Sequence, residues 1–568
     1  MQTEIRSSLV RGTALTLTLA APLQAQERTA LLVEGDPVPG LPGMTVDSLL
    51  NTRVNAAGGR AVTAEVLDSA SNLVSIAFGS PNATTPDAVL FQEGLFGTCQ
   101  QTSWEGNFGL AENGSVIYSA SCDDTQTLAV DLDSVYLDDL LVALEGQPIL
   151  GLPGKQFRFN GRPAVTAGDV PVWVGGIDDI ATGANEGNGL FMGLDQTVLI
   201  RTGDTLPNVA FPLDVNAVDL DFQFSLDGTQ YITLVDMQSG TSIDDGRVVV
   251  NGVGLDVGGA PVVEDSPVPA AVGGLPGESW DNFDFFGILD DGTCMFTGDT
   301  TGNADSDEFV FLGDSIVLRE GDTLADGNVV TGTLESASLG SNGDLALVWD
   351  IEDGFNGDLE AVLFNGLVVA REGDAIDLDG DGSVDPNAVI SGFSGFNSLS
   401  VAADQRLYVT ALVDTAGTAS TTDDVEVFLE IALAPFLNSS GVTEISLSAG
   451  GEQDLALFLP AEVEAEFYVV LGSTSGTMPG TLAGLLNLPL NFDAYTLFTL
   501  TNVNSPVLSP SFGVLDGLTG VATTFGVEPG QNPALAGTSF QHAYLTLSIT
   551  DIIDVNFTSE AIEVTLVP

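Results

Sequence analysis

Basic residues are scarce in this sequence. Lysine and arginine together number 13 against 79 aspartates and glutamates, so the formal net charge at pH 7 is −66, and Lys155 is the only lysine. Because proteins hold nucleic acid and anionic lipid by placing Lys and Arg against phosphates, this composition argues against both kinds of partner. A compact fold with so much self-repulsion also needs cations around it, supplied either by a saline medium or by bound divalent ions.

Histidine and cysteine are also rare, with one and three copies. These numbers leave no Cys/His set with the spacing of a zinc site. No G-x-S-x-G phrase suggests a serine nucleophile to accompany His542, which we expect to lie in a strand. Cys294 lies in an apolar run and is expected to be buried, whereas Cys99 and Cys122 are a disulfide candidate if the protein is exported.

The N-terminus has the pattern of a secretory signal peptide. Arg6 and Arg11 form a basic region, residues 14–23 form a short apolar stretch, and small residues near Ala25 suit signal peptidase. The apolar stretch is too short to span a bilayer, and no later segment reaches eighteen uninterrupted apolar residues. We therefore expect residues 1–25 to be removed and the mature protein to be secreted, with an extracellular or cell-surface location and no transmembrane segment.

Internal repetition determines the expected architecture. A phrase consisting of an apolar run and an acidic-Gly-Asp turn occurs first at residues 31–37 and clearly again at residues 319–322 and 371–374. Other copies lie at residues 142–148, 198–205 and 262–267, with a degenerate copy near Cys99. The result is seven units that repeat every 50 to 60 residues or so, roughly the spacing of propeller blades.

Each unit also contains short apolar runs joined by turn dipeptides. Asn-Gly and Asp-Gly pairs, in which both residues tolerate positive φ, are typical of tight β-hairpins. They occur at residues 113–114, 160–161, 227–228, 291–292 and 342–343, and a further turn precedes the acidic-Gly-Asp phrase, as at residues 365–366. The sequence therefore predicts about four strands in each unit.

Seven four-stranded units predict an all-β fold with a seven-bladed β-propeller over residues 28–434. The acidic-Gly-Asp phrase would end the outer strand of one blade and begin the crossing to the next. The first strand, residues 29–34, then has no blade of its own and should close the ring by pairing with the strand at residues 425–431. A β-solenoid is the alternative, although its repeats are usually shorter and more regular.

The repeats stop near residues 434–435, where the texture of the chain changes. Residues 437–568 contain short apolar runs between Gly, Pro and Asn clusters, and the strands expected there include residues 454–459, 494–500 and 543–549. This pattern predicts a separate C-terminal β-sandwich domain.

The Glu-Gly-Asp phrases, with Asn-Gly turns between them, resemble those of uncharacterised secreted tandem-repeat proteins of planctomycete-type bacteria. The tail resembles a C-terminal domain that recurs in such proteins, and its recognisable phrases lie at residues 472–480, 488–490, 515–516 and 542–544. The resemblance covers most of the mature chain and implies export. It transfers no catalytic residue, because that family has no established activity.

One acidic segment has the spacing of a calcium loop. Oxygen-bearing residues occupy loop positions 1, 3, 5, 7 and 9, and glycine occupies position 6, as in the first part of an EF-hand loop. The candidate calcium ligands are Asp377, Asp379, Asp381, Ser383 and Asp385. Position 12 holds Ala388 in place of the usual bidentate glutamate, so either the affinity is modest or another segment supplies the remaining ligand. The alternative is a solvated acidic loop.

The other conspicuous residues have simpler interpretations. Acidic clusters such as residues 303–308 are expected to be plain surface, because a chain with 79 acidic residues contains many chance neighbours. Aromatic side chains more often pack in cores than at exposed sugar-binding rims. We expect core packing for Trp104, Trp173, Trp280 and Trp349.

Two main interpretations of function stay open at this point. The first is a non-catalytic extracellular or cell-surface protein that binds a glycan or protein partner and is stabilised by calcium. The second is a calcium-dependent hydrolase or lyase acting on polysaccharide or phosphoester, for which carboxylates alone suffice. An enzyme should bring three or more carboxylates, or a carboxylate with Arg or Tyr, into the central channel. Apolar and small residues there would favour the binding protein. A purely structural envelope component is a third alternative.

Overall fold

The computed structural model describes residues 27–568 except 56, 97–98, 167, 215–221, 239–245, 325–326, 353–356, 382, 396–397, 404–405, 418–423, 433–435, 440–441, 459–466, 478–479, 484–485, 515–520, 550–552 and 560. The predicted signal peptide therefore lies outside the described residues. Within them the fold is all-β, as expected, and antiparallel pairing dominates the sheets. No helix in this part of the chain is long and apolar enough to cross a membrane.

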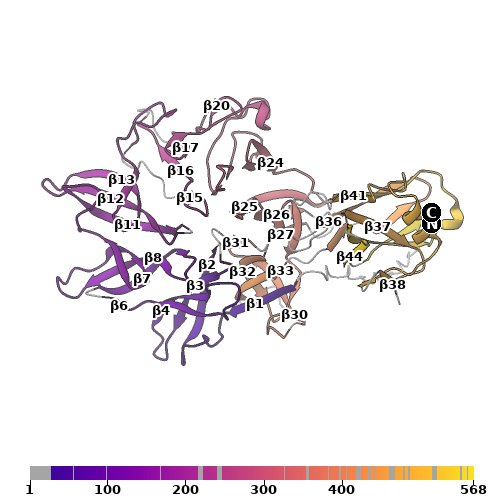
Figure 1. The fold of residues 1–568 in the computed structure, drawn as a ribbon, viewed down its shortest axis with the longest axis horizontal. Helices are drawn as coiled ribbons and strands as arrows, with labels where there is room; N and C mark the ends of the chain where they lie inside the picture. The colour runs from indigo at the N-terminus through magenta and orange to yellow at the C-terminus, as the bar shows by residue number, and fades with distance from the viewer. Residues whose placement is uncertain are drawn as a thin grey trace, which may run out of the picture.

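Seven sheets follow one another between residues 27 and 432, and the first three each contain four main strands (Figure 1). The first sheet consists of β2 (Thr45–Val54), β3 (Arg60–Leu67), β4 (Leu73–Ser80) and β5 (Ala88–Gln92). The second consists of β7 (Cys99–Leu110), β8 (Val116–Asp124), β9 (Leu132–Leu137) and β10 (Leu140–Leu144), with the short β6 (Leu95–Phe96) beside β7. The third consists of β11 (Lys155–Val165), β12 (Pro171–Asp179), β13 (Asn185–Met192) and β14 (Thr197–Arg201).

The next three sheets repeat the same strand order. The fourth consists of β15 (Phe222–Phe224), β16 (Tyr231–Asp236), β17 (Gly246–Val250) and β18 (Val253–Gly254), followed by the small hairpin of β19 (Asp256–Val257) and β20 (Ala260–Pro261). The fifth consists of β21 (Phe286–Ile288), β22 (Cys294–Gly298), β23 (Phe309–Leu312) and β24 (Ser315–Arg319). The sixth consists of β25 (Val329–Leu339), β26 (Leu345–Glu352), β27 (Asp358–Phe364) and β28 (Leu367–Arg371).

The seventh sheet combines the end of the repeats with the beginning of the described chain. Its strands are β29 (Ala375–Ile376), β30 (Asp385–Phe393), β31 (Leu399–Val401), β32 (Arg406–Asp414), β33 (Val425–Ala432) and β1 (Glu27–Val33). β1 pairs antiparallel with β33, from Glu27 opposite Ala432 to Val33 opposite Val427. The predicted pairing of the first strand with the last repeat is therefore confirmed. Figure 1 shows the seven sheets placed in chain order around a shared centre.

The acidic-Gly-Asp phrase joins one sheet to the next at six of the seven junctions, each time by a pair of backbone hydrogen bonds. In the phrase after β10, the Gly146 N–H donates to the Phe157 carbonyl at 2.8 Å, and the Phe157 N–H donates to the Gln147 carbonyl at 2.9 Å. Equivalent pairs join Gly35 and Asp36 to Val46, Gly203 and Asp204 to Leu213, Asp265 and Ser266 to Trp280, Gly321 and Asp322 to Val330, and Gly373 and Asp374 to Ile390. The repeated phrase is thus a connector between sheets, and its glycine has a positive φ, 77° at Gly146, that favours this residue type.

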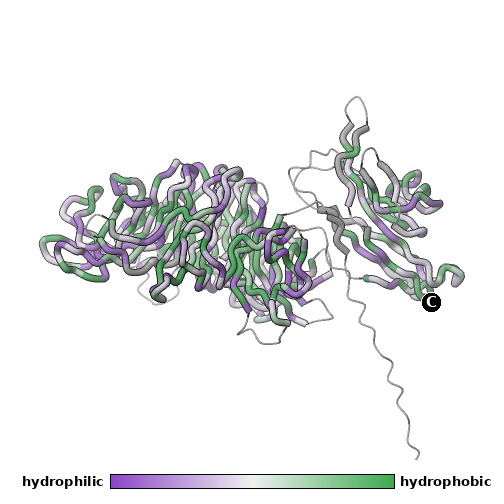
Figure 2. Tube along the Cα trace, turned by 90° about the horizontal axis from the view of Figure 1, so that it is seen from below, coloured by the Kyte–Doolittle hydropathy of each residue, from purple (hydrophilic) through white to green (hydrophobic). Residues whose placement is uncertain are grey.

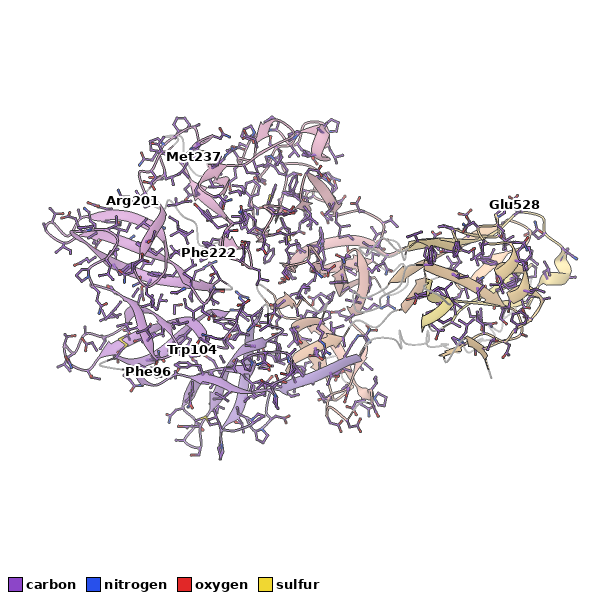
Figure 3. All side chains as sticks on the ribbon, viewed as in Figure 1. Phe96, Trp104, Arg201, Phe222, Met237 and Glu528 are labelled. Atoms are coloured by element: carbon purple, nitrogen blue, oxygen red, sulfur yellow. A yellow bond between two sulfur atoms is a disulfide. The ribbon has the colours of Figure 1, made fainter. Side chains whose placement is uncertain are left out.

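Apolar side chains fill the junction between each sheet and its neighbour. Seven hydrophobic clusters each combine buried residues of two neighbouring sheets, and one of them joins the seventh sheet to the first. In that cluster Val62 and Phe78 lie with Tyr408 and Phe428. Figure 3 shows side chains occupying the spaces between the ribbons, and Figure 2 shows apolar and polar stretches interleaved along the strands. All seven junctions are therefore packed in the same way.

The tryptophans and Cys294 largely follow expectation. Trp173, Trp280 and Trp349 are fully buried, whereas Trp104 is half-buried in the second sheet, where Figure 3 labels it. Cys294 is buried in β22, where loss of solvation raises the pKa of its thiol to about 11.

The turn dipeptides were interpreted correctly with one exception. The pairs at residues 113–114, 227–228, 291–292 and 342–343 connect consecutive strands as predicted. The pair Asn160-Gly161, however, lies inside β11, where the register with β12 shifts on both sides of it. The pair thus lies between two bulges of a long strand, and bulges and hairpin turns favour the same residues.

The C-terminal part contains two larger sheets that share one core. The first consists of β34 (Phe436–Ser439), β36 (Gly451–Phe458), β42 (Val521–Val527) and β40 (Leu508–Ser509). The second consists of β35 (Glu444–Ser446), β45 (Ile562–Val567), β43 (Ser539–Ile549), β37 (Phe467–Ser473), β41 (Phe512–Val514) and β44 (Ile553–Thr558). A separate hairpin is formed by β38 (Thr481–Ala483) and β39 (Leu486–Leu488). Leu455 and Phe525 of the first sheet share a cluster with Tyr468 and Tyr544 of the second.

One strand predicted here is wrong. Residues 494–500 belong to the helix α1 (Ala494–Thr501), not to a strand. Asp493 caps the helix by accepting hydrogen bonds from the Tyr495 and Thr496 backbone N–H groups, and the Thr496 hydroxyl completes a capping box. The Asp-x-x-Thr spacing was the available signal, since such a box satisfies N–H groups that the first turn leaves open. His542, in contrast, lies in a strand as expected.

We expect the connector glycines to be required for their conformation alone. A Cβ built on Gly146 meets nothing within 4 Å, so replacement by alanine adds no clash but forces an L-residue into the left-handed region. Gly146→Ala should therefore lower the free energy of unfolding by about 1–2 kcal/mol. Thermal or urea unfolding measures the effect.

The matched control is Gly168→Ala in a neighbouring turn. Gly168 has no positive φ, and its built Cβ meets only ordinary contact with Val170 at 3.8 Å. This variant should unfold like the wild type. Equal destabilisation of both variants would contradict the role given to Gly146.

Candidate metal-binding loop and central pocket

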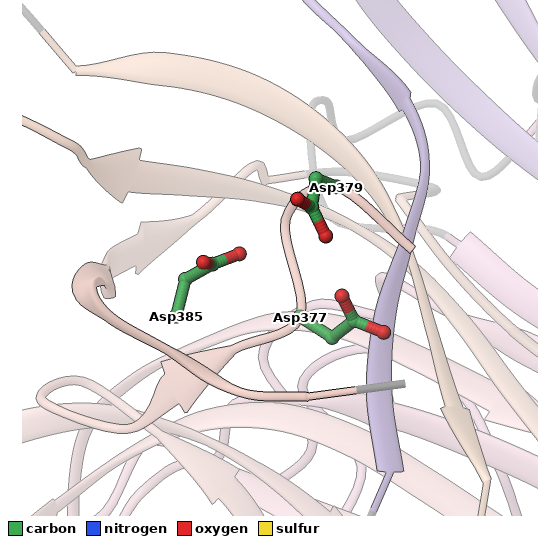
Figure 4. A group of neighbouring side chains, drawn as sticks. All are labelled: Asp377, Asp379 and Asp385. Atoms are coloured by element: carbon green, nitrogen blue, oxygen red, sulfur yellow. The ribbon is translucent and has the colours of Figure 1, made fainter. Parts of the chain in front are cut away.

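The candidate calcium loop connects β29 to β30 in the seventh sheet. The structure brings three of the predicted ligands together: one carboxylate oxygen from each of Asp377, Asp379 and Asp385 lies within 4.8 Å of the others (Figure 4). Asp377 is buried, Asp385 is half-buried and Asp379 is exposed. The site therefore has one side within the protein and one side open to solvent.

Asp381 and Ser383 are placed differently. Both are exposed, and Oδ1 of Asp381 accepts a hydrogen bond from the Ser383 N–H at 2.8 Å, which makes a local turn. Among the described residues, Asp381 does not belong to the three-carboxylate group. Gly382, at loop position 6, lies outside the described residues. Ala388, at position 12, is buried in the core of the seventh sheet, so this position contributes packing in place of a ligand.

Backbone N–H groups of the loop hold the carboxylates in position. The N–H groups of Gly380 and Asp381 donate to Oδ1 of Asp377 at 2.9 and 3.2 Å. The Leu378 N–H donates to Oδ2 of Asp385 at 2.9 Å. These bonds offset part of the repulsion among the carboxylates. Grouped carboxylate oxygens suit a hard divalent cation such as calcium.

The loop is also attached to the strand β1. The Asp377 N–H donates to the Arg28 carbonyl at 2.8 Å, and the Ala30 N–H donates to the Asp377 carbonyl at 2.9 Å. Figure 4 shows β1, in indigo, running beside Asp377. The first predicted ligand is therefore held by its backbone against the strand that connects the two ends of residues 27–432.

A pocket of about 210 Å³ lies where one strand from each of the seven sheets meets the others. Its lining includes residues of β2, β7, β11, β15, β21, β25 and β31, one strand from each sheet. The described lining residues are apolar or small, with a few amides and hydroxyls, and include no Asp, Glu, His or Cys. Arg53 is the one charged residue among them.

Arg53 is held by backbone carbonyls of two neighbouring sheets. Its Nε donates to the Phe108 carbonyl at 3.0 Å, and its Nη1 donates to the Thr52 carbonyl at 2.7 Å. Loss of solvation lowers the pKa of Arg53 to about 10, so the guanidinium is still charged at neutral pH. The sequence analysis missed this residue. The available signal was the scarcity of basic residues: with so few in the chain, each arginine within an expected strand is a candidate functional residue.

Several carboxylates fulfil structural roles at the junctions between sheets. Glu308, Glu360 and Glu426 accept hydrogen bonds from backbone N–H groups of the next sheet, donated by Leu334 at 2.9 Å, Phe393 at 2.6 Å and Leu49 at 2.5 Å. In each case the strand that donates the N–H has a register shift close to the donor. The expectation that residues 303–308 are plain surface is wrong for Glu308, which is buried because it satisfies an N–H that such a shift leaves unpaired.

Cys99 and Cys122 are joined by a disulfide on the neighbouring strands β7 and β8, with their Cα atoms 5.3 Å apart. Around it lies an aromatic group that includes Phe91, Trp104 and Tyr118, whose indole and phenol rings stack at 4.3 Å.

No family model matches the chain. No curated protein matches it either.

The buried Glu308 predicts a pH dependence of stability. Burial, together with the nearby Asp299, Asp284 and Glu320, raises the pKa of Glu308 to about 8. The folded state then keeps a proton that the unfolded chain releases near pH 4.5, so this residue lowers stability as the pH rises from about 4.5 to 8. Glu308→Gln keeps a carbonyl acceptor for Leu334 but carries no charge. It should raise the melting temperature at pH 9 by about 2 °C or more and change it little at pH 5.

Melting curves of Glu308→Gln, the exposed control Glu112→Gln and the wild type at both pH values measure the effect. A stabilisation of Glu308→Gln that is the same at pH 5 and pH 9 would show that the charge of Glu308 is not its cause.

The disulfide predicts sensitivity to reduction. Cys99 and Cys122 are 23 residues apart, and closing a loop of this length stabilises a fold by about 3 kcal/mol. Reductant should therefore lower the melting temperature of the wild type but not that of the Cys99→Ala/Cys122→Ala variant. Peptide mapping without reduction should yield the linked pair, and detection of two free thiols at these positions would refute the assignment.

Proposed function

We propose that residues 28–434 form a seven-bladed β-propeller, that residues 437–568 form a β-sandwich, and that the protein is an exported, non-catalytic binding protein. The propeller is supported by the seven successive sheets, the seven packed junctions and the strand β1 that completes the seventh sheet. The sandwich is supported by the two C-terminal sheets with a common core. Export is supported by the basic and apolar N-terminal pattern and by the resemblance to secreted repeat proteins.

The observation that carries the binding function is the composition of the central pocket. A propeller hydrolase needs carboxylates, or a carboxylate with Arg or Tyr, where its substrate enters. The described residues that line the pocket offer one arginine, with small and apolar residues and no carboxylate. This composition favours binding over hydrolysis or elimination. The partner we propose is an extracellular glycan or protein, and the third reading, an envelope component, shares the same surface location.

Calcium at the loop of residues 377–385 would stabilise the closure of the ring. Asp377, Asp379 and Asp385 would hold the ion, and the remaining oxygens would come from water or carbonyl groups. Because the Asp377 backbone pairs with β1, ordering the loop also fixes the strand that joins the first and last repeats. The ion would act on stability, with no step of chemistry assigned to it.

Thermal unfolding with calcium and with chelator tests this proposal. At a calcium concentration one hundred times the dissociation constant, a site present only in the folded state adds about 2.7 kcal/mol of stability. We therefore expect the wild type to melt at a higher temperature in calcium. Asp379→Asn should abolish most of this shift, because it removes an exposed ligand without disturbing the core.

The matched control is Asp414→Asn. Asp414 also accepts backbone hydrogen bonds in a turn, from Ala416 and Gly417, but belongs to no three-carboxylate group in the described chain. It should keep the full calcium response. Absence of any calcium-dependent shift in the wild type would refute the metal site. A glycan array on the same sample, with cell fractionation, then separates a binding protein from an envelope component.

A further inference from the structure

Arg53 differs from eight other basic residues that the structure describes. Eight basic side chains form ion pairs with Asp or Glu: Arg28, Arg60, Lys155, Arg158, Arg201, Arg247, Arg319 and Arg406. Arg53 forms no ion pair within the described part of the chain, although 79 acidic residues are available. Its charge is therefore neutralised by no protein carboxylate in that part of the chain.

Hydrogen bonds hold the guanidinium of Arg53 in place but involve only some of its N–H donors. An arginine has five N–H donors, and the bonds to Phe108 and Thr52 use one on Nε and one on Nη1. Nη2 has no hydrogen-bond partner among the described residues. The ring of Phe108 lies 5.8 Å from Arg53 Cζ. The side chain is thus preorganised, with donors on both terminal nitrogens left for a ligand.

The pocket around Arg53 suits an anion in size and lining. Its volume of about 210 Å³ is several times the share of one water molecule, about 30 Å³. Gln223, Ser338 and Ser341 line the same pocket and form no side-chain hydrogen bond within the described chain. These groups can donate hydrogen bonds to oxygen atoms of a ligand.

The net charge of −66 opposes anion binding at long range but does not exclude it. Charges separated by more than about 8 Å are largely screened at an ionic strength of 0.15 M. No Asp or Glu is among the described lining residues, so Arg53 supplies the one charge that the described part of the chain places in the lining.

We propose that the central pocket binds a small oxyanion, a carboxylate, sulfate or phosphate group, on Arg53. The bound group is either a free anion or the acidic substituent of a sugar. This inference names a ligand class for the binding role proposed above and rests on that role, but it is independent of calcium. Calcium-dependent melting and anion binding are separate measurements, so each proposal fails on its own.

Isothermal titration of the full mature chain with sodium sulfate, sodium phosphate, sodium acetate and sodium glucuronate, at constant ionic strength, tests the proposal. We expect saturable binding of one equivalent for at least one of the four. Binding of sulfate, phosphate or acetate assigns a free anion, whereas binding of glucuronate alone assigns a sugar acid. No saturable binding of any of them to the wild type overturns the proposal.

Arg53→Gln should abolish this binding. Arg53→Lys, which keeps the charge but loses the fork of donors, should weaken it at least tenfold. The control is Arg201→Gln, which removes a partly exposed arginine paired with Asp204 and should bind like the wild type. If Arg53→Gln does not fold, Ser338→Phe fills the pocket and should also abolish binding. Unchanged affinity in Arg53→Lys and Ser338→Phe would overturn the assignment of the site.

Discussion

The structure depends on the pair of backbone hydrogen bonds that joins an acidic-Gly-Asp turn to the next sheet. At six junctions the turn donates one N–H to the following sheet and accepts one in return. The end of one sheet and the start of the next are thereby held at fixed distance and angle. Repeating one such connection along the chain gives successive sheets a similar placement relative to one another, as the propeller proposed above requires. The apolar clusters then fill spaces that this connector has already defined.

The acidity of the chain follows partly from the same architecture. The aspartate of the turn accepts a bond from the N–H three residues earlier, as Asp322 does from Arg319 at 2.9 Å. An ionised carboxylate serves these turns well because it only accepts hydrogen bonds. Part of the negative charge is thus tied to turns, and basic residues pair with carboxylates at selected points, such as Arg319 with Glu278. Glu308, in contrast, accepts from an N–H group at a register shift of the next sheet in a setting that keeps it protonated at neutral pH.

How far the sequence predicted the structure depended on whether a signal was local. The connector was recognisable because its glycine and aspartate are both required within a few residues. The pairing of β1 with β33 followed from counting strands, since an unpaired edge had to find a partner. The loop spacing predicted that Asp377, Asp379 and Asp385 lie together, as they do. Asp381 instead forms a local turn with Ser383.

The failures have physical reasons of two kinds. Asn160-Gly161 and residues 494–500 carried ambiguous local signals, because bulges share turn residues and a short apolar run fits either a helix or a strand. Glu308 and Arg53 were missed because their environments come from distant segments. Glu308 accepts from Leu334, and Arg53 donates to Phe108, 26 and 55 residues away. No periodicity within either segment could have indicated burial or a pocket.

The junction between the ends of residues 27–432 differs from the other six in its energetics. A hairpin brings its strands together at a loop-closure cost of about 1 kcal/mol, whereas bringing together segments about 400 residues apart costs about 5 kcal/mol on the same scaling. The β1–β33 ladder holds only one edge of β1, so other contacts are needed to offset the larger loop-closure cost. Arg28 supplies one, since it pairs with Asp374 at 2.8 Å and donates to the Val369 carbonyl, both in a buried setting.

The loop of Asp377 supplies another contact on the opposite edge of β1, through its backbone N–H and carbonyl. β1 is thus held from both sides, by β33 and by the loop, while Arg28 anchors its start. A cation on the loop would order the weaker of these two sides, because the loop has few buried residues and exposed carboxylates that repel one another.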